Sequence, residues 1–179
     1  ATGRALARGQ LQTILWKLNS RRHFQSLPRV AWNDISWDRK VGNAVFRAGF
    51  TGYKHRPGLN RSDAALCTAN ERCRLVLLAG KSGSPIVDAG LTSMGRSGLN
   101  ATIDGINVVR SKLSMKAQLR CKAIIMLEGN DVASGLKWAL LSNSVVIMRP
   151  PTITSWAMEE LLEPWIHYVP LDLDLADIV

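Results

Sequence analysis

The sequence predicts an α/β fold, a Rossmann-like parallel sheet with flanking helices, from two observations. First, short apolar runs alternate along the chain with helical patterns, and strands separated by helices form parallel sheets with crossover connections. Second, the run at 123–127 (AIIML) is apolar throughout, as expected of a strand buried on both faces. Polar residues and a glycine follow at 128–131, before the next helical pattern. We therefore expect a ligand at this edge of the sheet.

The chain divides into two predicted parts. Residues 1–40 are expected to form a helical N-terminal segment and a connector, because the apolar residues of 6–18 follow helical spacing and 21–38 is polar. Residues 41–179 are expected to form the α/β domain.

The first half of this domain is predicted from its apolar runs and breaks. A strand is expected at 43–48, then a loop rich in Gly, Lys, Arg and Pro that ends at residue 62. A short helix is expected at 63–68 and an apolar strand at 75–79. The Gly- and Ser-rich stretch 81–100 predicts a loop.

The second half repeats the alternation of helix and strand. A helix at 114–121 is expected to lead into the strand at 123–127. Asp131 is a good N-cap for a helix over 132–141. Beyond it we expect a strand at Val145 and Val146, a proline-marked loop, a helix over 155–163 with a solvated face of Glu159, Glu160 and Glu163, and a strand in which Trp165, His167 and Tyr168 alternate.

Charge is unevenly distributed along the chain. The first 62 residues hold 12 Lys and Arg against 2 Asp and Glu, and the remaining residues hold 11 against 12, which gives the net charge of +9. A basic segment can bind nucleic acid or acidic polysaccharide. The solvated face of a helix explains the same pattern, and nucleic acid is the less favoured partner.

Three cysteines, Cys67, Cys73 and Cys121, form no CxxC pair and have no histidine at metal spacing, so no metal site is predicted. Cys67 and Cys73 can pair in an oxidising compartment, but buried free thiols are the favoured interpretation. Glycosylation sequons at 60–62 and 100–102 are weak evidence for a secretory compartment. The chain has no run of 18 apolar residues, so no membrane span is expected.

Two ordered patches carry a family resemblance. The first, 44–56 (AVFRAGFTGYKHR), contains Arg47. The second holds, in order, Gly129, Lys137, Leu141, Ser142, Ser144, Val145, Val146, Pro164, Trp165, His167, Tyr168 and Pro170. Together they resemble the C-terminal, donor-binding part of glycosyltransferase family 90, which includes capsule-associated, lipopolysaccharide-modifying and protein O-glucosyl- and O-xylosyltransferases. The resemblance implies the C-terminal domain of a GT-B type enzyme.

The resemblance also implies a donor site. Arg47 is expected to hold the donor diphosphate, since an arginine fork binds two oxygens at once. Glu128 is expected either to bind a ribose hydroxyl pair or to cap the neighbouring turn. The remaining expected donor-binding residues are Thr51, Gly52, Gly129, Asn130, Asp131, Ser134 and Lys137. The sequence departs from the family pattern at Ala48, where a glycine is usual, and at Gly135, where many relatives have a cation.

The implied reaction is transfer of a hexose or pentose, from UDP-glucose or UDP-xylose, to a hydroxyl of a glycan, a lipid-linked sugar or a protein. No cofactor or metal is implied. The family's general base belongs to its N-terminal domain, so we name no catalytic residue; nothing in the context of Asp34 or Asp38 supports either one. The chain is expected to be a fragment that binds donor without transfer, in the secretory lumen or the bacterial cytoplasm. The alternative is a non-catalytic basic module that binds nucleic acid or acidic polysaccharide.

Overall fold

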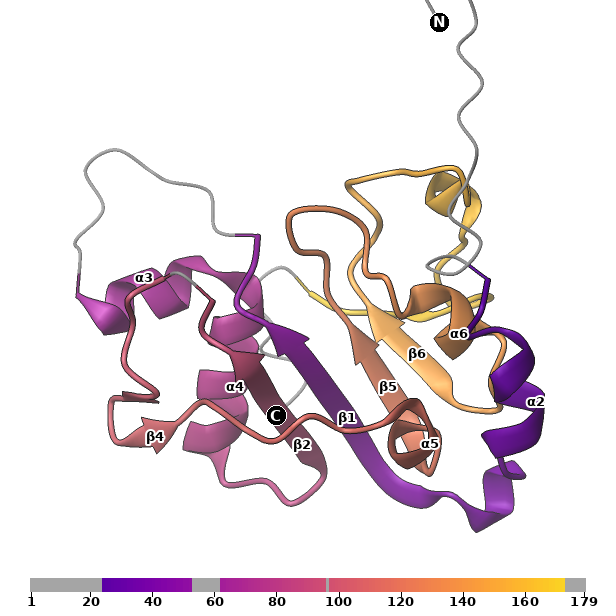
Figure 1. Cartoon of the computed structure of the whole chain (residues 1–179), viewed down its shortest axis with the longest axis horizontal. Coiled ribbons are helices and arrows are strands. Elements are labelled where there is room, and N and C mark those ends of the chain that lie inside the picture. The colour runs from indigo at the N-terminus through magenta and orange to yellow at the C-terminus, as the bar shows by residue number, and fades with distance from the viewer. Residues whose placement is uncertain (1–23, 53–61, 96, 173–179) are drawn as a thin grey trace, which may run out of the picture.

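The computed structural model describes residues 24–52, 62–95 and 97–172 (Figure 1). Its centre is a five-stranded sheet in the order β2-β1-β5-β6-β7, in which every neighbouring pair is parallel. The strands are β1 (Val41–Gly49), β2 (Val87–Ser93), β5 (Cys121–Met126), β6 (Val145–Met148) and β7 (Val169–Pro170). The predicted α/β, Rossmann-like fold is confirmed.

The strand order makes the sheet doubly wound. From β1 the chain moves outward to β2, then crosses back to β5 and continues outward in the opposite direction to β6 and β7. The order therefore reverses between β1 and β5. In open parallel sheets this reversal leaves a crevice at the carboxyl ends of the two strands, where ligands bind.

Helices cover both faces of the sheet. On β1, Phe46 packs with α3 (Asp63–Ala69) and α4 (Glu71–Ser82), whereas its neighbour Val45 packs on the opposite face. Ile125 and Ile124 divide in the same way on β5, because successive strand residues point to opposite faces. The second face is covered by α5 (Met115–Gln118) and α6 (Leu136–Leu140). Figure 1 shows α4 beside β2 and α6 beside β6.

The strand predicted at 75–79 is wrong, because these residues form the buried part of α4. A short apolar run fits a buried helix as well as a strand, and the helix boundaries decide between them. The side chain of Asn70 caps α4 by accepting a hydrogen bond from the Cys73 amide at 3.0 Å. Gly83, at φ +64°, ends the helix in the left-handed conformation that glycine allows.

The loop predicted over 81–100 is also wrong, because it contains β2. Gly90 suits this strand because a Cβ there would lie 2.2 Å from Cγ of Arg110. The segment around Val109 covers the outer edge of β2: Leu91 N donates to Val108 O and Arg110 N donates to Leu91 O, each at 2.8 Å. Along the chain, a small hairpin of β3 (Thr102–Ile103) and β4 (Ile106–Asn107) lies between β2 and the segment around Val109.

The C-terminal elements are shorter than predicted. The helix expected over 132–141 is only α6, and its N-cap is Gly135 rather than Asp131. The helix expected over 155–163 reduces to the 3₁₀ turn η2 (Glu159–Leu161).

Two further expectations in this region are wrong. The strand predicted at Trp165 is absent from the described structure, since Trp165 has φ +66° and β7 begins at Val169. The carboxylate of Glu159 is not solvated, because the residue is 4% exposed and accepts bonds from the amide and hydroxyl of Ser155 at 2.7 and 2.8 Å.

The segment before β1 closes the amino edge of the sheet. The predicted helix at 6–18 lies outside the described residues, which begin with α2 (Pro28–Asn33) and the 3₁₀ turn η1 (Trp37–Arg39). The Lys40 side chain is fully buried and binds the carboxylate of Asp34 and the carbonyl of Leu119.

Asp34 also joins this segment to the sheet, because its carboxylate accepts from the backbone amide of Asn143, just before β6. Burial alone raises the pKa of the Asp34 carboxyl, but the hydrogen bonds from Asn143, Lys40 and Ile35 outweigh burial and hold the pKa below its ordinary value.

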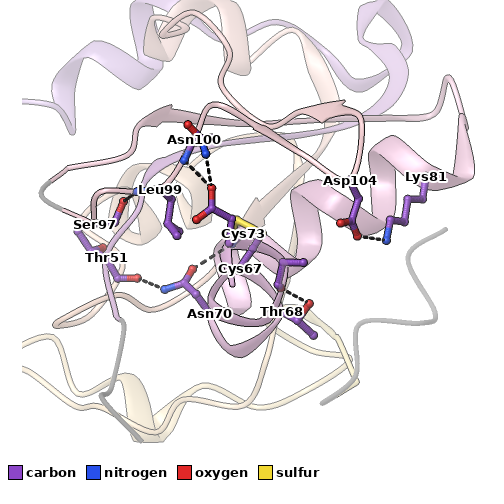
Figure 2. Close-up of a disulfide and its surroundings, with 12 residues drawn as sticks. Thr51, Cys67, Thr68, Asn70, Cys73, Lys81, Ser97, Leu99, Asn100 and Asp104 are labelled. Carbon is purple, nitrogen blue, oxygen red and sulfur yellow. Dashed lines mark hydrogen bonds and ion pairs between the residues drawn. A yellow bond between two sulfur atoms is a disulfide. The ribbon is translucent and has the colours of Figure 1, made fainter. Parts of the chain in front are cut away.

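Cys67 and Cys73 form a disulfide, so the expectation of free thiols is wrong for this pair. The bend between α3 and α4, where Asn70 has an extended conformation, brings their Cα atoms to 5.0 Å. Figure 2 shows the Asn70 side chain between the disulfide and Thr51, whose carbonyl it binds at 2.9 Å. Cys121 is a buried free thiol, as predicted.

Candidate functional site

A cavity of about 280 Å³ lies at the carboxyl ends of β1 and β5. Residues 46–49 of β1 form one wall, and Met126 and Leu127, at the end of β5, form another. The loop residues 133–135 and Trp138 of α6, with Arg72 of α4 and Gln118 of α5, complete the lining. This is the point where the strand order reverses, so the cavity lies where doubly wound sheets bind ligands.

The loops that follow β1 and β5 touch each other beside this cavity. The amide of Gly52 donates to Oδ1 of Asn130 at 2.8 Å. A Cβ on Gly52, which has φ +81°, would lie 3.0 Å from the backbone of Gly129. A Cβ on Gly129 would lie 2.4 Å from Oγ1 of Thr51. The structure thus brings together four of the predicted site residues, and both glycines are required by the close approach of the two loops.

Arg72, which sequence reasoning missed, fastens these loops together from the first turn of α4. Its Nε donates to Glu128 O at 2.9 Å, and its Nη2 donates to Leu127 O at 2.7 Å. Its Nη1 donates to Gly49 O at 3.2 Å and to Oγ1 of Thr51 at 2.7 Å. One guanidinium therefore links the ends of β1 and β5.

The charge of Arg72 has no carboxylate partner in the described part of the chain, since none of the ion pairs there includes it. The neighbouring Glu71 pairs with Arg149 instead. Burial lowers the pKa of the Arg72 guanidinium, although an arginine stays protonated in a protein. The site therefore contains a desolvated positive charge held by neutral acceptors.

Arg47, the predicted diphosphate ligand, lines the same cavity but is engaged by the protein. Its Nη2 binds both carboxylate oxygens of Asp88 at 2.8 and 2.9 Å. Its Nη1 donates to the carbonyls of Phe46 and Asp88, and its Nε donates to Ser111 O. The Arg47 side chain is 8% exposed. Each of its three nitrogens donates to a protein acceptor, so its role toward a ligand stays a prediction.

The two predicted acidic residues of the loop have structural partners. The carboxylate of Glu128 accepts from the amides of Thr152 and Ile153 at 2.8 and 3.0 Å, and from the Thr152 hydroxyl. The carboxylate thus joins the end of β5 to the loop after β6, and both of its predicted roles stay predictions. Asp131 binds the adjacent Val132 amide at 2.8 Å, so it stabilises the loop and not a helix. The helix start that was expected at Asp131 lies at Gly135 instead.

The last two predicted site residues, Ser134 and Lys137, lie in different surroundings. Ser134 lines the cavity, next to Gly135. Lys137 lies with its Nζ 5.4 Å from the centroid of the Trp156 ring, a cation–π contact outside the cavity lining. A Cβ on Gly135 would lie 2.9 Å from Cε of Met126, so position 135 borders the cavity directly.

A second cavity, of about 180 Å³, also has Arg72 in its lining. It is lined by Thr51, Gly52 and Gly129 together with Asn70 and Thr152. Glu71, Arg72 and Glu128 add charged groups to its wall. Because Arg72 lines both cavities, the two spaces adjoin at this guanidinium.

No protein-family model matches the chain. It is 29% identical over 175 residues to the O-glucosyltransferase LpsA of Dichelobacter nodosus, an alignment that covers 98% of this chain and 46% of LpsA. The chain is similar to an O-glucosyltransferase. Two uncharacterized viral proteins, 179R of Invertebrate iridescent virus 6 and 035R of Invertebrate iridescent virus 3, are 29% and 31% identical, each over 80% of this chain and 13% of its own length. The chain spans about half the length of LpsA, and the similarity supports a glycosyltransferase-like relationship.

Two searches concern only residues 24–52, 62–95 and 97–172. Within them, no group of three or more His, Cys, Asp or Glu residues is placed to hold a metal ion. No helix in these ranges is long and apolar enough to cross a membrane.

The sequence offered little signal for Arg72, Asn70 and Trp138. Arg72 stands between two cysteines without a recognisable motif, and it falls between the helix predicted at 63–68 and the strand predicted at 75–79. The N-cap preference of Asn70 was the available clue, because it starts α4 and so places the next two residues at the carboxyl edge of the sheet.

Proposed function

We propose that this chain is the donor-binding part of a glycosyltransferase of family 90. It binds a UDP-linked sugar, UDP-glucose or UDP-xylose, for transfer to a hydroxyl of a glycan, a lipid-linked sugar or a protein. The observation that carries this proposal is the cavity between the carboxyl ends of β1 and β5, at the reversal of strand order. The similarity to an O-glucosyltransferase supports the transferase chemistry.

The linings of the two cavities suit different parts of such a donor. The larger cavity offers Met126 and Trp138, which are apolar or aromatic surfaces for a nucleoside, together with the hydroxyl of Ser134. The smaller cavity offers carboxylates, hydroxyls and an amide, which are partners for sugar hydroxyls.

In the proposed reaction, the bond between the anomeric carbon and the diphosphate breaks while the acceptor hydroxyl attacks that carbon and loses its proton to a base. The protein assists by stabilising the charge that develops on the diphosphate. Asp34 and Asp38 lie before β1, at the amino edge of the sheet and opposite the cavities. We therefore assign donor binding to the described residues and name no base.

The Cys67–Cys73 disulfide supports the secretory lumen as the compartment, because disulfides persist in oxidising surroundings. Reducing cytoplasm is the less compatible of the two predicted locations.

Isothermal titration calorimetry tests the proposal. UDP, UDP-glucose and UDP-xylose are titrated into the chain, with a single-stranded oligonucleotide and heparin as the competing anionic ligands. Micromolar to millimolar UDP binding without oligonucleotide or heparin binding is the expected result. Binding of either polyanion without UDP binding would replace the transferase with a basic binding module, the alternative that the charge of the first 62 residues favours.

A further inference from the structure

We infer that Arg72, and not Arg47, is the residue that binds the donor diphosphate, and that the diphosphate lies on the larger-cavity side of Arg72. This inference rests on the proposed function and adds to it the anion-binding residue and the direction in which the donor lies.

The first argument is the number of N–H groups that each arginine has available. A guanidinium carries five. In Arg47, Nε donates to one protein acceptor, Nη1 donates to two, and Nη2 donates to the two oxygens of one carboxylate, that of Asp88. Arg72 donates to four acceptors, which leaves one N–H, on Nη2, without an acceptor in the described structure. Arg72 therefore retains a donor for a ligand that borders it.

The second argument is net charge. Arg47 is neutralised by its bidentate pair with Asp88. The four acceptors of Arg72 are three backbone carbonyls and one hydroxyl, all neutral. A desolvated cation without a counter-ion attracts an anion more strongly than a solvated one does, because the local dielectric is low. A diphosphate provides the missing counter-ion.

The third argument concerns which of the two cavities holds the diphosphate. The larger cavity has no Asp or Glu in its lining. The smaller cavity has two: Glu71, whose charge is paired with Arg149, and Glu128, whose carboxylate opposes a phosphate but can accept a hydrogen bond from a hydroxyl. The diphosphate therefore lies in the larger cavity against Arg72, and the sugar extends past Arg72 toward Glu71 and Glu128.

The fourth argument is preorganisation. An arginine normally loses rotamer freedom when it binds a ligand. Bonds to Gly49, Thr51, Leu127 and Glu128 already fix the guanidinium of Arg72. Binding an anion then needs little further ordering, so most of the electrostatic attraction contributes to affinity.

Calorimetry on the full 179-residue chain tests the inference with UDP and uridine, which differ by the diphosphate. Arg72→Gln is expected to weaken UDP binding about 10- to 100-fold, the range for a lost bond to a charged group, and uridine binding by less than about 3-fold. Raising the salt concentration is expected to weaken UDP binding to the wild type more than to this variant. Arg39→Gln, an exposed arginine in η1 at the amino edge, removes the same charge and is expected to change neither ligand.

Arg72→Lys keeps the charge but loses the planar fork, so it is expected to weaken UDP binding about 3- to 10-fold with uridine unchanged. Wild-type UDP affinity in this variant overturns the inference even if Arg72→Gln does not fold. Equal losses of UDP and uridine in Arg72→Gln would make Arg72 a loop clamp only. A UDP-selective loss in Arg47→Gln, without one at Arg72, would place the diphosphate at Arg47. Each of these results leaves the proposed function standing, whereas a wild type that binds neither UDP nor uridine refutes the proposed function itself.

Discussion

Replacing Lys40 with methionine tests whether the buried ion pair at the amino edge holds the segment before β1 onto the sheet. The Lys40 side chain is 0% exposed and that of Asp34 is 8% exposed. In Lys40→Met, the Asp34 carboxylate keeps the Asn143 amide but loses its cation, and the Leu119 carbonyl loses its donor.

Breaking a buried pair by removing one partner typically costs about 3–5 kcal/mol, because the remaining charge is left uncompensated. We expect a loss in this range from the free energy of unfolding. Since a domain of this size has about 5–15 kcal/mol in total, the variant should be close to its folding threshold.

The chain offers a matched control on its surface. Lys81 pairs with Asp104 at 2.8 Å, but the two side chains are 49% and 42% exposed. Lys81→Met makes the same chemical change and should cost less than about 1 kcal/mol, because solvent screens an exposed pair. Urea unfolding of both variants, with equal m-values, measures the two losses. A Lys40→Met loss as small as that of Lys81→Met would refute the assigned role of the buried pair.

The Lys40–Asp34 pair also predicts that the free energy of unfolding falls at acid pH. The pKa of Asp34 is lower in the folded chain than in the unfolded one, so its contribution is complete above the ordinary carboxyl value of 3.8 and is lost as the pH falls through the folded pKa. Asp34→Asn should therefore reduce stability near neutral pH and flatten the decline below about pH 4, measured by urea unfolding at several pH values. An unchanged acid decline in this variant would assign it to other carboxyls.

Three further variants test the site and the disulfide. Gly129→Ala, whose Cβ would lie 2.4 Å from Oγ1 of Thr51, should weaken UDP binding at least about 10-fold by calorimetry through displacement of the loop, a change of about 1.4 kcal/mol or more; wild-type affinity would show that the loops do not shape the site. Gly135→Arg should strengthen UDP binding without affecting uridine, because it places a cation on the cavity wall, and unchanged UDP affinity would put the diphosphate elsewhere. Reduction of Cys67–Cys73 should lower stability by about 2 kcal/mol in urea, as expected for a short closed loop, and a Cys67→Ser/Cys73→Ser variant should not respond to the reductant.

The central part of the fold was predictable because strands that are buried on both faces consist mostly of apolar residues. β1 and β5 lie in the middle of the sheet, and the apolar run of β5 reads as a strand covered on both faces. Glycines at 52 and 129 marked the ends of these strands correctly. The α/β class followed from this pattern, whereas Thr51 and Gly52 were expected at the site only from the family resemblance.

The missed elements have local patterns that tertiary contacts override. β2 contains Asp88 and Gly90, which strands usually disfavour, and its pairing with β1 and the Arg47–Asp88 bond compensate. The interior of α4 is too apolar and too short to distinguish from a strand by periodicity. Arg72 could not be selected from the sequence, because its importance comes from carbonyls that only the assembled sheet brings together.

Both edges of the sheet, as far as the described residues show them, carry features that hinder strand addition. At one edge, the backbone amide and carbonyl of Leu91 in β2 are already bonded to the segment at 108–110. At the other, β7 has only two residues, and one is Pro170, which has no N–H to donate. A neighbouring chain therefore finds little exposed backbone to pair with at either of these edges, so the β-sheet itself protects against edge-to-edge aggregation. Contacts with another polypeptide are left to side-chain surfaces, such as the exposed Trp165 and Ile166.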